Sequence, residues 1–252
     1  MDEFFIFNLL MITFGATSLI VFVALFFITA GYGQHLHKKW GPTINNKIGW
    51  FVMEVPTVIV YFIYYLIGDR KTDIVPLIFM AIWMFHYCQR TFIFPFLIRG
   101  KQQMPISIIL MGFTFNGINA YLQARWIYLF STSYTLNWLF NPLFIIGVII
   151  FLCGITINLY SDHVIRNLRN PGETEYKIPN GGMFKYVSSP TYFGEITEWV
   201  GWAIMTWSLP GLVFAIWTFA NLAPRARSNH LWYKEMFPNY PKNRKALIPF
   251  IF

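Results

Sequence analysis

The chain has 252 residues, of which 56% are hydrophobic and only 12% are charged. Soluble domains carry about 25% charged residues, so this composition excludes an ordinary soluble protein. The formal net charge of +8 is also found in nucleic-acid-binding proteins. Here, however, the basic residues lie between apolar segments, which is typical of membrane loops. We therefore predict an all-α, polytopic integral membrane protein with no nucleic-acid partner.

Seven apolar segments are candidates for membrane-spanning helices, which need about 20 mainly apolar residues each. They cover about residues 5–30, 48–67, 74–97, 105–128, 136–160, 191–207 and 209–223. The first is too long for the core of a signal peptide and follows Asp2 and Glu3 rather than a basic segment. We therefore predict that it is retained as a helix.

Lysines and arginines concentrate in the first, third and fifth loops and in the segment after residue 224. They include Lys38, Lys39, Lys47, Arg99, Lys101, Arg166, Arg169, Lys177, Lys185, Arg225, Arg227 and Lys234. Because basic residues favour the cytoplasmic side of a membrane, we expect the N-terminus outside and the C-terminus in the cytosol. This orientation requires an odd number of spans, which agrees with seven.

Two polar residues of the first half are candidates for chemistry inside the membrane. Glu54 lies about 9 Å from the start of the second span and Tyr87 about 15 Å from the end of the third, at 1.5 Å per residue. At such similar depths their side chains can meet. A carboxyl group buried there is expected to stay protonated, so that it and the phenol offer two donors to a carbonyl oxygen. The alternative is an ion pair between Glu54 and Arg90 that only holds two helices together.

A second group of polar residues lies where the fifth span ends. Asn158, Asp162 and Arg169 follow helical spacing and therefore line one face. Guanidinium groups suit phosphate oxygens, although such arginines also bind lipid headgroups. Glu195 and Glu198 in the sixth span favour a cofactor site, because lipid anchoring does not call for acids in a membrane helix.

Several other kinds of site are not supported. No glycine-rich dinucleotide motif and no P-loop is present, and the five histidines and two cysteines do not show metal-ligand spacing, so we expect no metal. The fourth span is unusually polar, with Gly112, Asn116, Gly117, Asn119 and Gln123. These residues indicate either a cavity lining or close helix packing through glycine.

The chain resembles the steroid 5-alpha-reductase family along nearly its whole length. The resemblance is carried in order by GYGQH, FVMEVP, HYCQRTF, INLYSDHVIRNLRNPGE, YFGEITEW, TWSLPG, PRARSNHLWY and YPKNRKALIPF. It implies an NADPH-dependent oxidoreductase, a 3-oxo-5-alpha-steroid 4-dehydrogenase with seven spans. Such an enzyme reduces the Δ4 double bond of a 3-oxo-Δ4 steroid, with hydride added at C5 and a proton at C4.

The resemblance also implies roles for particular residues. Glu54 and Tyr87 match the catalytic pair that polarises the C3 carbonyl, and Trp50 and Met53 lie at substrate-binding positions. The positions that resemble NADPH-binding residues are Tyr32, Asn158, Asp162, Arg169, Glu195, Arg225, Asn229 and Tyr233. Residues 1–252 then form one domain, in which 1–130 are mainly substrate-side helices and 131–252 mainly bind NADPH. An apolar steroid-like substrate is expected to enter a monomer from the lipid of the endoplasmic reticulum or bacterial inner membrane, depending on the source.

Four residues depart from the family pattern. Met53 stands where animal enzymes have glutamine, Phe94 replaces a tyrosine, Gln34 a lysine and Thr191 an asparagine. Met53 removes a polar contact near the substrate, so the identity of the substrate stays open. Alternatives are a reductase of another apolar enone or of a polyprenoid, an isoprenylcysteine-type membrane methyltransferase, and a lipid-binding or transport protein whose charges only fix topology.

Overall fold

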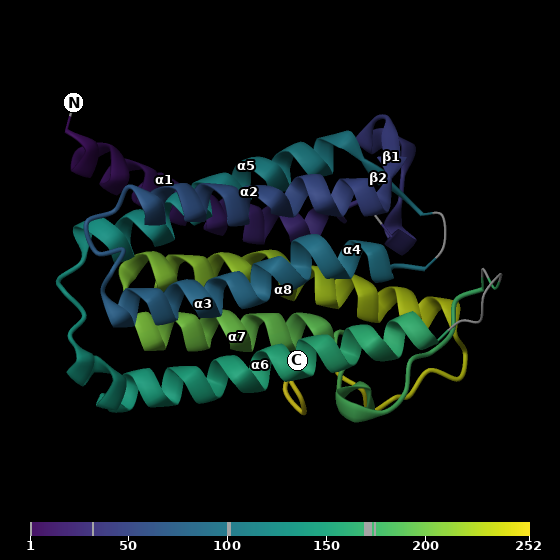
Figure 1. Ribbon diagram of the computed structural model, residues 1–252. Coiled ribbons are helices and arrows are strands. Elements are labelled where there is room, and N and C mark those ends of the chain that lie inside the picture. The colour runs from purple at the N-terminus through teal and green to yellow at the C-terminus, as the bar shows by residue number, and fades with distance from the viewer. Residues whose placement is uncertain (1, 32, 100–101, 169–172, 174) are drawn as a thin grey trace. The chain divides into compact units, whose positions relative to one another are not determined.

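The computed structural model describes residues 2–31, 33–99, 102–168, 173 and 175–252, and most of them are helical (Figure 1). The α-helices are α1 (Glu3–Phe27), α2 (Asn46–Leu66), α3 (Ile74–Cys88), α4 (Phe94–Leu97), α5 (Ile106–Arg125), α6 (Pro142–Asn167), α7 (Pro190–Thr206) and α8 (Leu209–Met236). π-Helical turns cover Gln89–Ile93 and Trp126–Phe130. Short 3-10 turns cover Gly33–His35, Lys38–Trp40, Leu136–Phe140 and Gly182–Lys185.

The predicted helical architecture is confirmed, and its long apolar helices support an integral membrane protein. Within the described part of the chain, four helical segments are long and apolar enough to cross a membrane: Glu3–Phe27, Asn46–Leu66, Ile74–Leu97 and Pro142–Asn167. The other three long helices, α5, α7 and α8, also lie at predicted spans. Because α7 has only 17 residues and α5 and α8 contain more polar side chains, the seven crossings and their orientation stay a prediction.

Two predicted helix boundaries are wrong. The fifth span was expected from residue 136, but Leu136–Phe140 forms a separate 3-10 turn and α6 begins at Pro142. Asn141 Oδ1 accepts the N–H of Leu143 at 2.9 Å, and proline is favoured in the first turn of a helix. The seventh helix was expected to end near residue 223, but α8 continues through Pro224, where packing of the flanking alanines outweighs the lost backbone hydrogen bond.

The loops add β structure that the all-α prediction did not include. Strand β1 (Thr43–Asn45) pairs antiparallel with β2 (Gln103–Pro105), with Ile44 opposite Met104. These strands immediately precede α2 and α5, whose close packing brings the two loops together. At Gly112 of α5 a Cβ atom would collide with the side chain of Met53 of α2. Close packing through glycine is therefore part of the reason for the unusual composition of α5.

The chain divides into two compact units. The first comprises Met1–Phe14, Ala30–Ile145 and Ser208–Pro210, and the second comprises Gly15–Thr29, Ile146–Trp207 and Gly211–Phe252. Aromatic side chains dominate both interiors, with Tyr61 and Trp83 fully buried in the first unit and Trp199 and Trp202 in the second. The predicted functional division at residue 130 stays a prediction.

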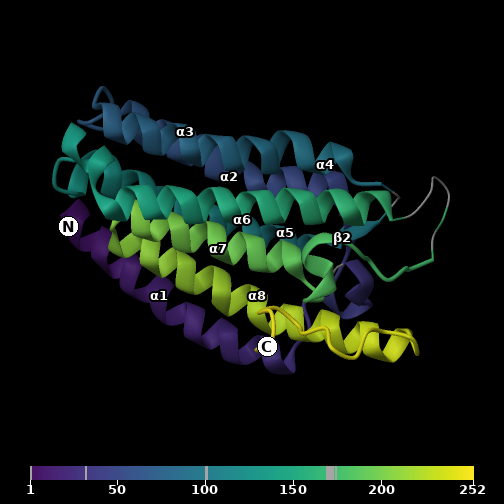
Figure 2. The same cartoon turned by 90° about the horizontal axis from the view of Figure 1, so that it is seen from below.

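In the second unit, α6 and α7 approach unusually closely. Figures 1 and 2 show α7 running between α6 and α8. Gly147 and Gly154 on α6 face the backbone of α7, and Gly194 and Gly201 on α7 face the backbone of α6. A Cβ atom at Gly194 would lie 2.6 Å from the backbone nitrogen of Asn158, where no side chain fits. Small residues thus set the distance between these helices.

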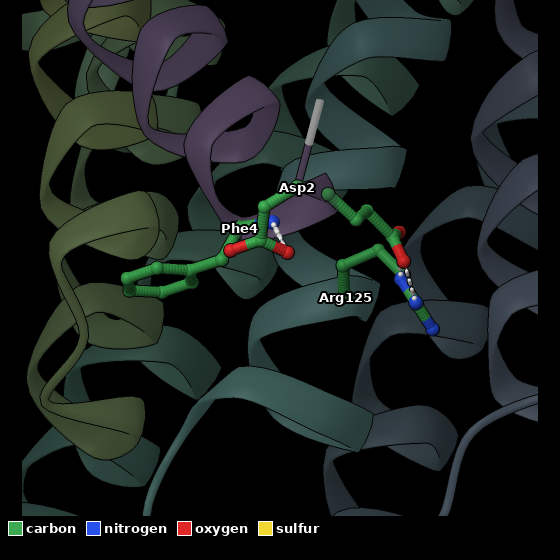
Figure 3. A network of polar contacts seen from close by, with 4 residues as sticks. Asp2, Phe4 and Arg125 are labelled. Atoms are coloured by element: carbon green, nitrogen blue, oxygen red, sulfur yellow. Dashed lines mark hydrogen bonds and ion pairs between the residues drawn. The ribbon is translucent and has the colours of Figure 1, made fainter.

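The start of α1 is held to the end of α5 in the first unit (Figure 3). Arg125 donates from Nε to Glu3 Oε1 at 2.7 Å and from Nη2 to Glu3 Oε2 at 2.5 Å. Its guanidinium carbon also lies 5.3 Å from the ring centre of Tyr64. Asp2 caps the same helix by accepting the N–H of Phe4 at 3.4 Å. The acidic start of the chain therefore neutralises a buried arginine.

Candidate functional site

Glu54 lies on the buried face of α2. The helix is capped by Asn45, whose Oδ1 accepts the N–H of Lys47 at 2.9 Å. Glu54 comes eight residues after the first residue of the helix, which is about 12 Å along its axis. Its side chain is 8% exposed, and Thr57 and Tyr61 continue the same buried face at helical spacing. The carboxyl group therefore lies in the interior of the first unit.

Asn116 of α5 orients this carboxyl group. Its Nδ2 donates to the Glu54 Oε2 atom at 3.2 Å and to the carbonyl oxygen of Met53 at 2.7 Å. The amide is 6% exposed, so these bonds compete little with water. The sequence indicated that α5 is polar but not which helix its amides contact. The structure brings Asn116 to Glu54.

Tyr87 is connected to the same part of α2. Its ring is 3% exposed and its centre lies 4.5 Å from the ring of Trp83 and 4.8 Å from that of His86. The Trp83 Nε1–H donates to the carbonyl oxygen of Thr57 at 3.1 Å, and the Thr57 hydroxyl donates to the carbonyl oxygen of Glu54 at 2.5 Å. Thr57 and Trp83, which sequence reasoning missed, thus connect the backbone of Glu54 to Tyr87. Thr57 donates to that backbone, and the ring of Trp83 contacts the ring of Tyr87.

Arg90 and Trp50 lie on the side of Glu54 toward the start of α2. Arg90 is 9% exposed, and its guanidinium carbon lies 4.9 Å from the ring centre of Trp50 and 4.2 Å from that of Phe94. The π-helical turn Gln89–Ile93 begins two residues after Tyr87, and such turns are frequent at functional sites. Phe94 thus supports the arginine through its ring face.

In the second unit, Asn158 and Asp162 lie on the buried face of α6, as their spacing predicted. They are 3% and 7% exposed. Asn158 Nδ2 donates to the carbonyl oxygen of Thr191 at 3.1 Å. Beside this bond, the hydroxyl groups of Ser161 and Thr191 are buried and have no hydrogen-bond partner among the described residues. Buried hydroxyls normally have partners, so this part of the unit has spare capacity for a polar ligand.

Glu195 and Arg225 lie near the cytosolic ends that were predicted for α7 and α8. Glu195 is half-buried, and Glu198, one turn later, is fully buried beside Gly154. The guanidinium carbon of Arg225 lies 5.5 Å from the ring centre of Tyr192 on α7. The pair of helices α7 and α8 therefore carries both acidic and basic side chains, and Arg225 of α8 contacts α7. Tyr32 and Arg169, which were also predicted to bind the cofactor, lie outside the described residues.

Asn229 and Tyr233 lie on the part of α8 that extends beyond the predicted span. Asn229 Nδ2 donates to Ser189 Oγ at 3.4 Å. The ring of Tyr233 stacks on that of Tyr240, with centres 5.4 Å apart and planes at 11°. Both predicted cofactor-binding residues are thus positioned by segments outside α8.

Ser188 is the centre of a buried network that sequence reasoning missed. Its Oγ atom lies 2.5 Å from His230 Nδ1, 2.6 Å from the Tyr240 hydroxyl and 3.1 Å from the carbonyl oxygen of Lys245. A serine hydroxyl has one hydrogen, and the Lys245 carbonyl can only accept it. When the serine hydrogen is donated to that carbonyl, His230 Nδ1–H and the Tyr240 hydroxyl both donate to Ser188.

His230 is neutral at ordinary pH. Burial, followed by the positive charges of Lys234, Arg244 and Lys245, lowers the pKa of His230 to about 4. Because His230 adjoins Asn229 and Tyr240 contacts Tyr233, the network fixes α8 against the segments before α7 and after α8. It supports predicted cofactor-binding residues without being one of them.

Known proteins resemble this chain over its full length. A family profile described as 3-oxo-5-alpha-steroid 4-dehydrogenase matches residues 102–252. Steroid 5-alpha-reductase DET2 of Gossypium hirsutum is 42% identical over 252 residues, which are 98% of this chain and 98% of that protein. The 3-oxo-5-alpha-steroid 4-dehydrogenase 1 of Mus musculus is 40% identical, covering 100% of this chain and 99% of the relative. The Homo sapiens protein of that name is 40% identical over 223 residues, 88% of this chain and 86% of its own length.

Proposed function

We propose, from the premise that this chain belongs to the 3-oxo-5-alpha-steroid 4-dehydrogenase family of oxidoreductases, that it reduces the Δ4 double bond of a 3-oxo-Δ4 steroid. NADPH, when bound, would supply the hydride that is added at C5. A proton added at C4 completes the 5-alpha-3-oxo product. The observation that carries the proposal is the buried Glu54 carboxyl, oriented by Asn116, on a backbone that Thr57 and Trp83 connect to Tyr87.

Glu54 and Tyr87 are proposed to hold the C3 oxygen of the substrate. Addition of hydride at C5 moves electron density onto that oxygen, so donors aimed at it stabilise the transition state more than the substrate. Such a donor contributes about 10²- to 10³-fold to the rate in a water-excluded site. Burial of both side chains and support of the carboxyl by Asn116 favour this role. Trp50 and Met53, on the same helix as Glu54, are proposed to contact the steroid.

The cofactor-binding role is assigned to residues of the second unit, together with Tyr32. The proposed set is Asn158, Asp162, Arg169, Glu195, Arg225, Asn229 and Tyr233. Two observations fit a dinucleotide: buried hydroxyls of Ser161 and Thr191 with hydrogen-bonding capacity to spare, and a guanidinium of Arg225 that suits phosphate. Asn158 donates to the backbone carbonyl oxygen of Thr191. Threonine in place of the family's asparagine at position 191 therefore leaves this hydrogen bond in place.

The proposal includes a topology. We propose seven membrane crossings with the N-terminus outside, so that the cofactor-binding residues lie on the cytosolic side. The substrate is apolar and is proposed to enter from the lipid, into a monomer. The membrane is proposed to be the bacterial inner membrane or the endoplasmic reticulum, according to the source.

The test is anaerobic NADPH oxidation by the purified protein in detergent, with testosterone or progesterone and mass spectrometry of the product. We expect a mass gain of two hydrogens, with deuterium at C5 when the cofactor carries it at the transferred position. Tyr87→Phe, prepared identically, is the matched control and should show little product. NADPH binding without reduction of any enone steroid would contradict the proposed substrate, and binding of S-adenosylmethionine instead would favour a methyltransferase.

A further inference from the structure

The segment that follows Leu247 presents two large apolar side chains outward. Phe250 and Ile251 are 79% and 77% exposed, and we call them the apolar tip. The segment closes on itself below them, because the N–H groups of Leu247 and Ile248 donate to the backbone oxygen of Phe252 at 2.7 and 2.6 Å. Phe250 has a φ of 66°, a conformation that bulky residues rarely adopt. The turn thus holds the tip outward despite backbone strain.

The base of this turn is fixed to the second unit at a defined level. Leu247 is 1% exposed and packs with Ala223 and Ala226 of α8. The partly buried residues around it are Phe22, Tyr192, Phe193, Ile196, Ile248 and Phe252. Phe22 lies near the end of the apolar helix α1, and Tyr192 and Phe193 lie in the first turn of α7. Ala223 and Ala226 flank the point where α8 changes from apolar to basic. All these positions are boundaries between apolar and polar sequence, so the base lies at the level of the bilayer surface.

An aromatic ring contacts the tip, and two lysines lie on the adjoining backbone segments. The ring of Tyr186 lies 5.5 Å from that of Phe250. The segment containing Lys185 and Tyr186 runs beside Lys245, whose N–H donates to the carbonyl oxygen of Tyr186 at 2.8 Å. Lys185, Tyr186 and Lys245 are all exposed. Figure 2 shows the segment after α8 returning along that helix. Lys245 of this segment pairs with Val187, three residues before α7 begins.

We propose that the apolar tip inserts into the boundary between headgroups and acyl chains of the bilayer that the protein spans, with Lys185 and Lys245 contacting lipid phosphates. Exposed aromatic and aliphatic side chains flanked by lysines are suited to this layer. Anionic lipid attracts basic residues near the surface. A second copy of the chain fits less well, because a two-fold contact through the tip would bring identical lysines together. The proposal does not depend on the reaction catalysed.

The test uses the full chain in nanodiscs with a nitroxide spin label on Ile251→Cys, after Cys88→Ala and Cys153→Ala. The matched control is Asn243→Cys, an exposed position on the same segment. Power saturation then compares accessibility to oxygen, which concentrates in lipid, with accessibility to a water-soluble nickel chelate. We expect a several-fold higher oxygen-to-nickel ratio at position 251 than at position 243. Equal nickel accessibility at the two positions would overturn the proposal, as would a label at 251 shielded from both reagents, which indicates a protein partner.

A second arm tests the lysines. In nanodiscs that contain phosphatidylserine, the label at 251 should move deeper than in pure phosphatidylcholine. Replacing Lys185 and Lys245 by glutamine should remove that difference, because each lysine strengthens binding to an anionic surface about fivefold. An unchanged response to phosphatidylserine in the double variant would overturn the role of the lysines. If Ile251→Cys does not yield folded protein, Phe250→Cys serves in its place.

Discussion

The two units support their candidate residues in different ways. In the first unit, side-chain contacts position the candidate residues. Asn116 donates to the Glu54 carboxyl, and Trp83 donates to the Thr57 carbonyl oxygen and contacts the ring of Tyr87. In the second, glycines bring α6 and α7 to backbone contact, and hydroxyl groups beside Asn158 keep spare capacity. The first arrangement suits donors whose geometry is set before the substrate arrives. The second suits a polar ligand that completes the hydrogen bonding.

The largest effect is expected in the first unit, from removal of the Tyr87 hydroxyl. Tyr87→Phe should lower turnover about 10²- to 10³-fold, because a donor to the developing negative charge is lost. Tyr61→Phe is the matched control, since Tyr61 is also buried and its ring stacks on Trp83, the same ring that contacts Tyr87. Steady-state rates at saturating NADPH measure both. Similar rates for wild type and Tyr87→Phe would remove this tyrosine from the mechanism.

In the second unit, the largest effect should come from a backbone position. Gly194→Ala places a methyl group 2.6 Å from the Asn158 nitrogen, which should destabilise the fold by about 1–3 kcal/mol and weaken NADPH binding. Gly117→Ala is the control, because its added Cβ would meet only Pro56, at an ordinary 3.9 Å. Thermal unfolding and cofactor titration distinguish the two. If both variants behave alike, glycine packing does not set the geometry at Asn158.

A smaller effect is expected when Glu54 keeps its carboxyl group but loses its orienting partner. Asn116→Leu removes a hydrogen bond to a carboxyl group and should cost about 1–1.5 kcal/mol, or about tenfold in kcat/KM for the steroid. NADPH affinity should not change, because Asn116 contacts only α2 in the hydrogen bonds described. An equal loss of cofactor affinity in this variant would show that the two units are not functionally separable.

The helical framework could be predicted because membrane helices are continuous apolar runs, and helical spacing alone placed Asn158 and Asp162 on one buried face. The contacts of Asn116 with Met53 and Glu54 could not, since the polar composition of α5 does not reveal which helix it faces. Likewise, the Ser188 network joins residues 42 and 52 positions apart. The extension of α8 past Pro224 was missed because local propensity gave way to packing. The functional roles themselves stay predictions.

The smallest effect at neutral pH should come from His230. Its pKa is lowered to about 4 in the folded protein from 6.5, so the unfolded chain binds more protons between these values. This residue's contribution to stability is therefore present above pH 6.5 and is lost as the pH falls toward 4. His230→Asn, which retains a donor toward Ser188, should flatten that part of the curve. Melting temperatures from pH 4 to 8 test this, and parallel curves for both proteins would contradict it.

The most direct test of the two roles compares Glu54→Gln with Asn158→Ala by NADPH titration and by single-turnover reduction at saturating NADPH. We expect Glu54→Gln to bind NADPH with wild-type affinity but to reduce the steroid at least about 100-fold more slowly. Asn158→Ala should bind NADPH about tenfold more weakly and, once saturated, react within a few-fold of the wild-type rate. Wild-type turnover in Glu54→Gln, or unchanged NADPH affinity in Asn158→Ala, would contradict the division between the two units.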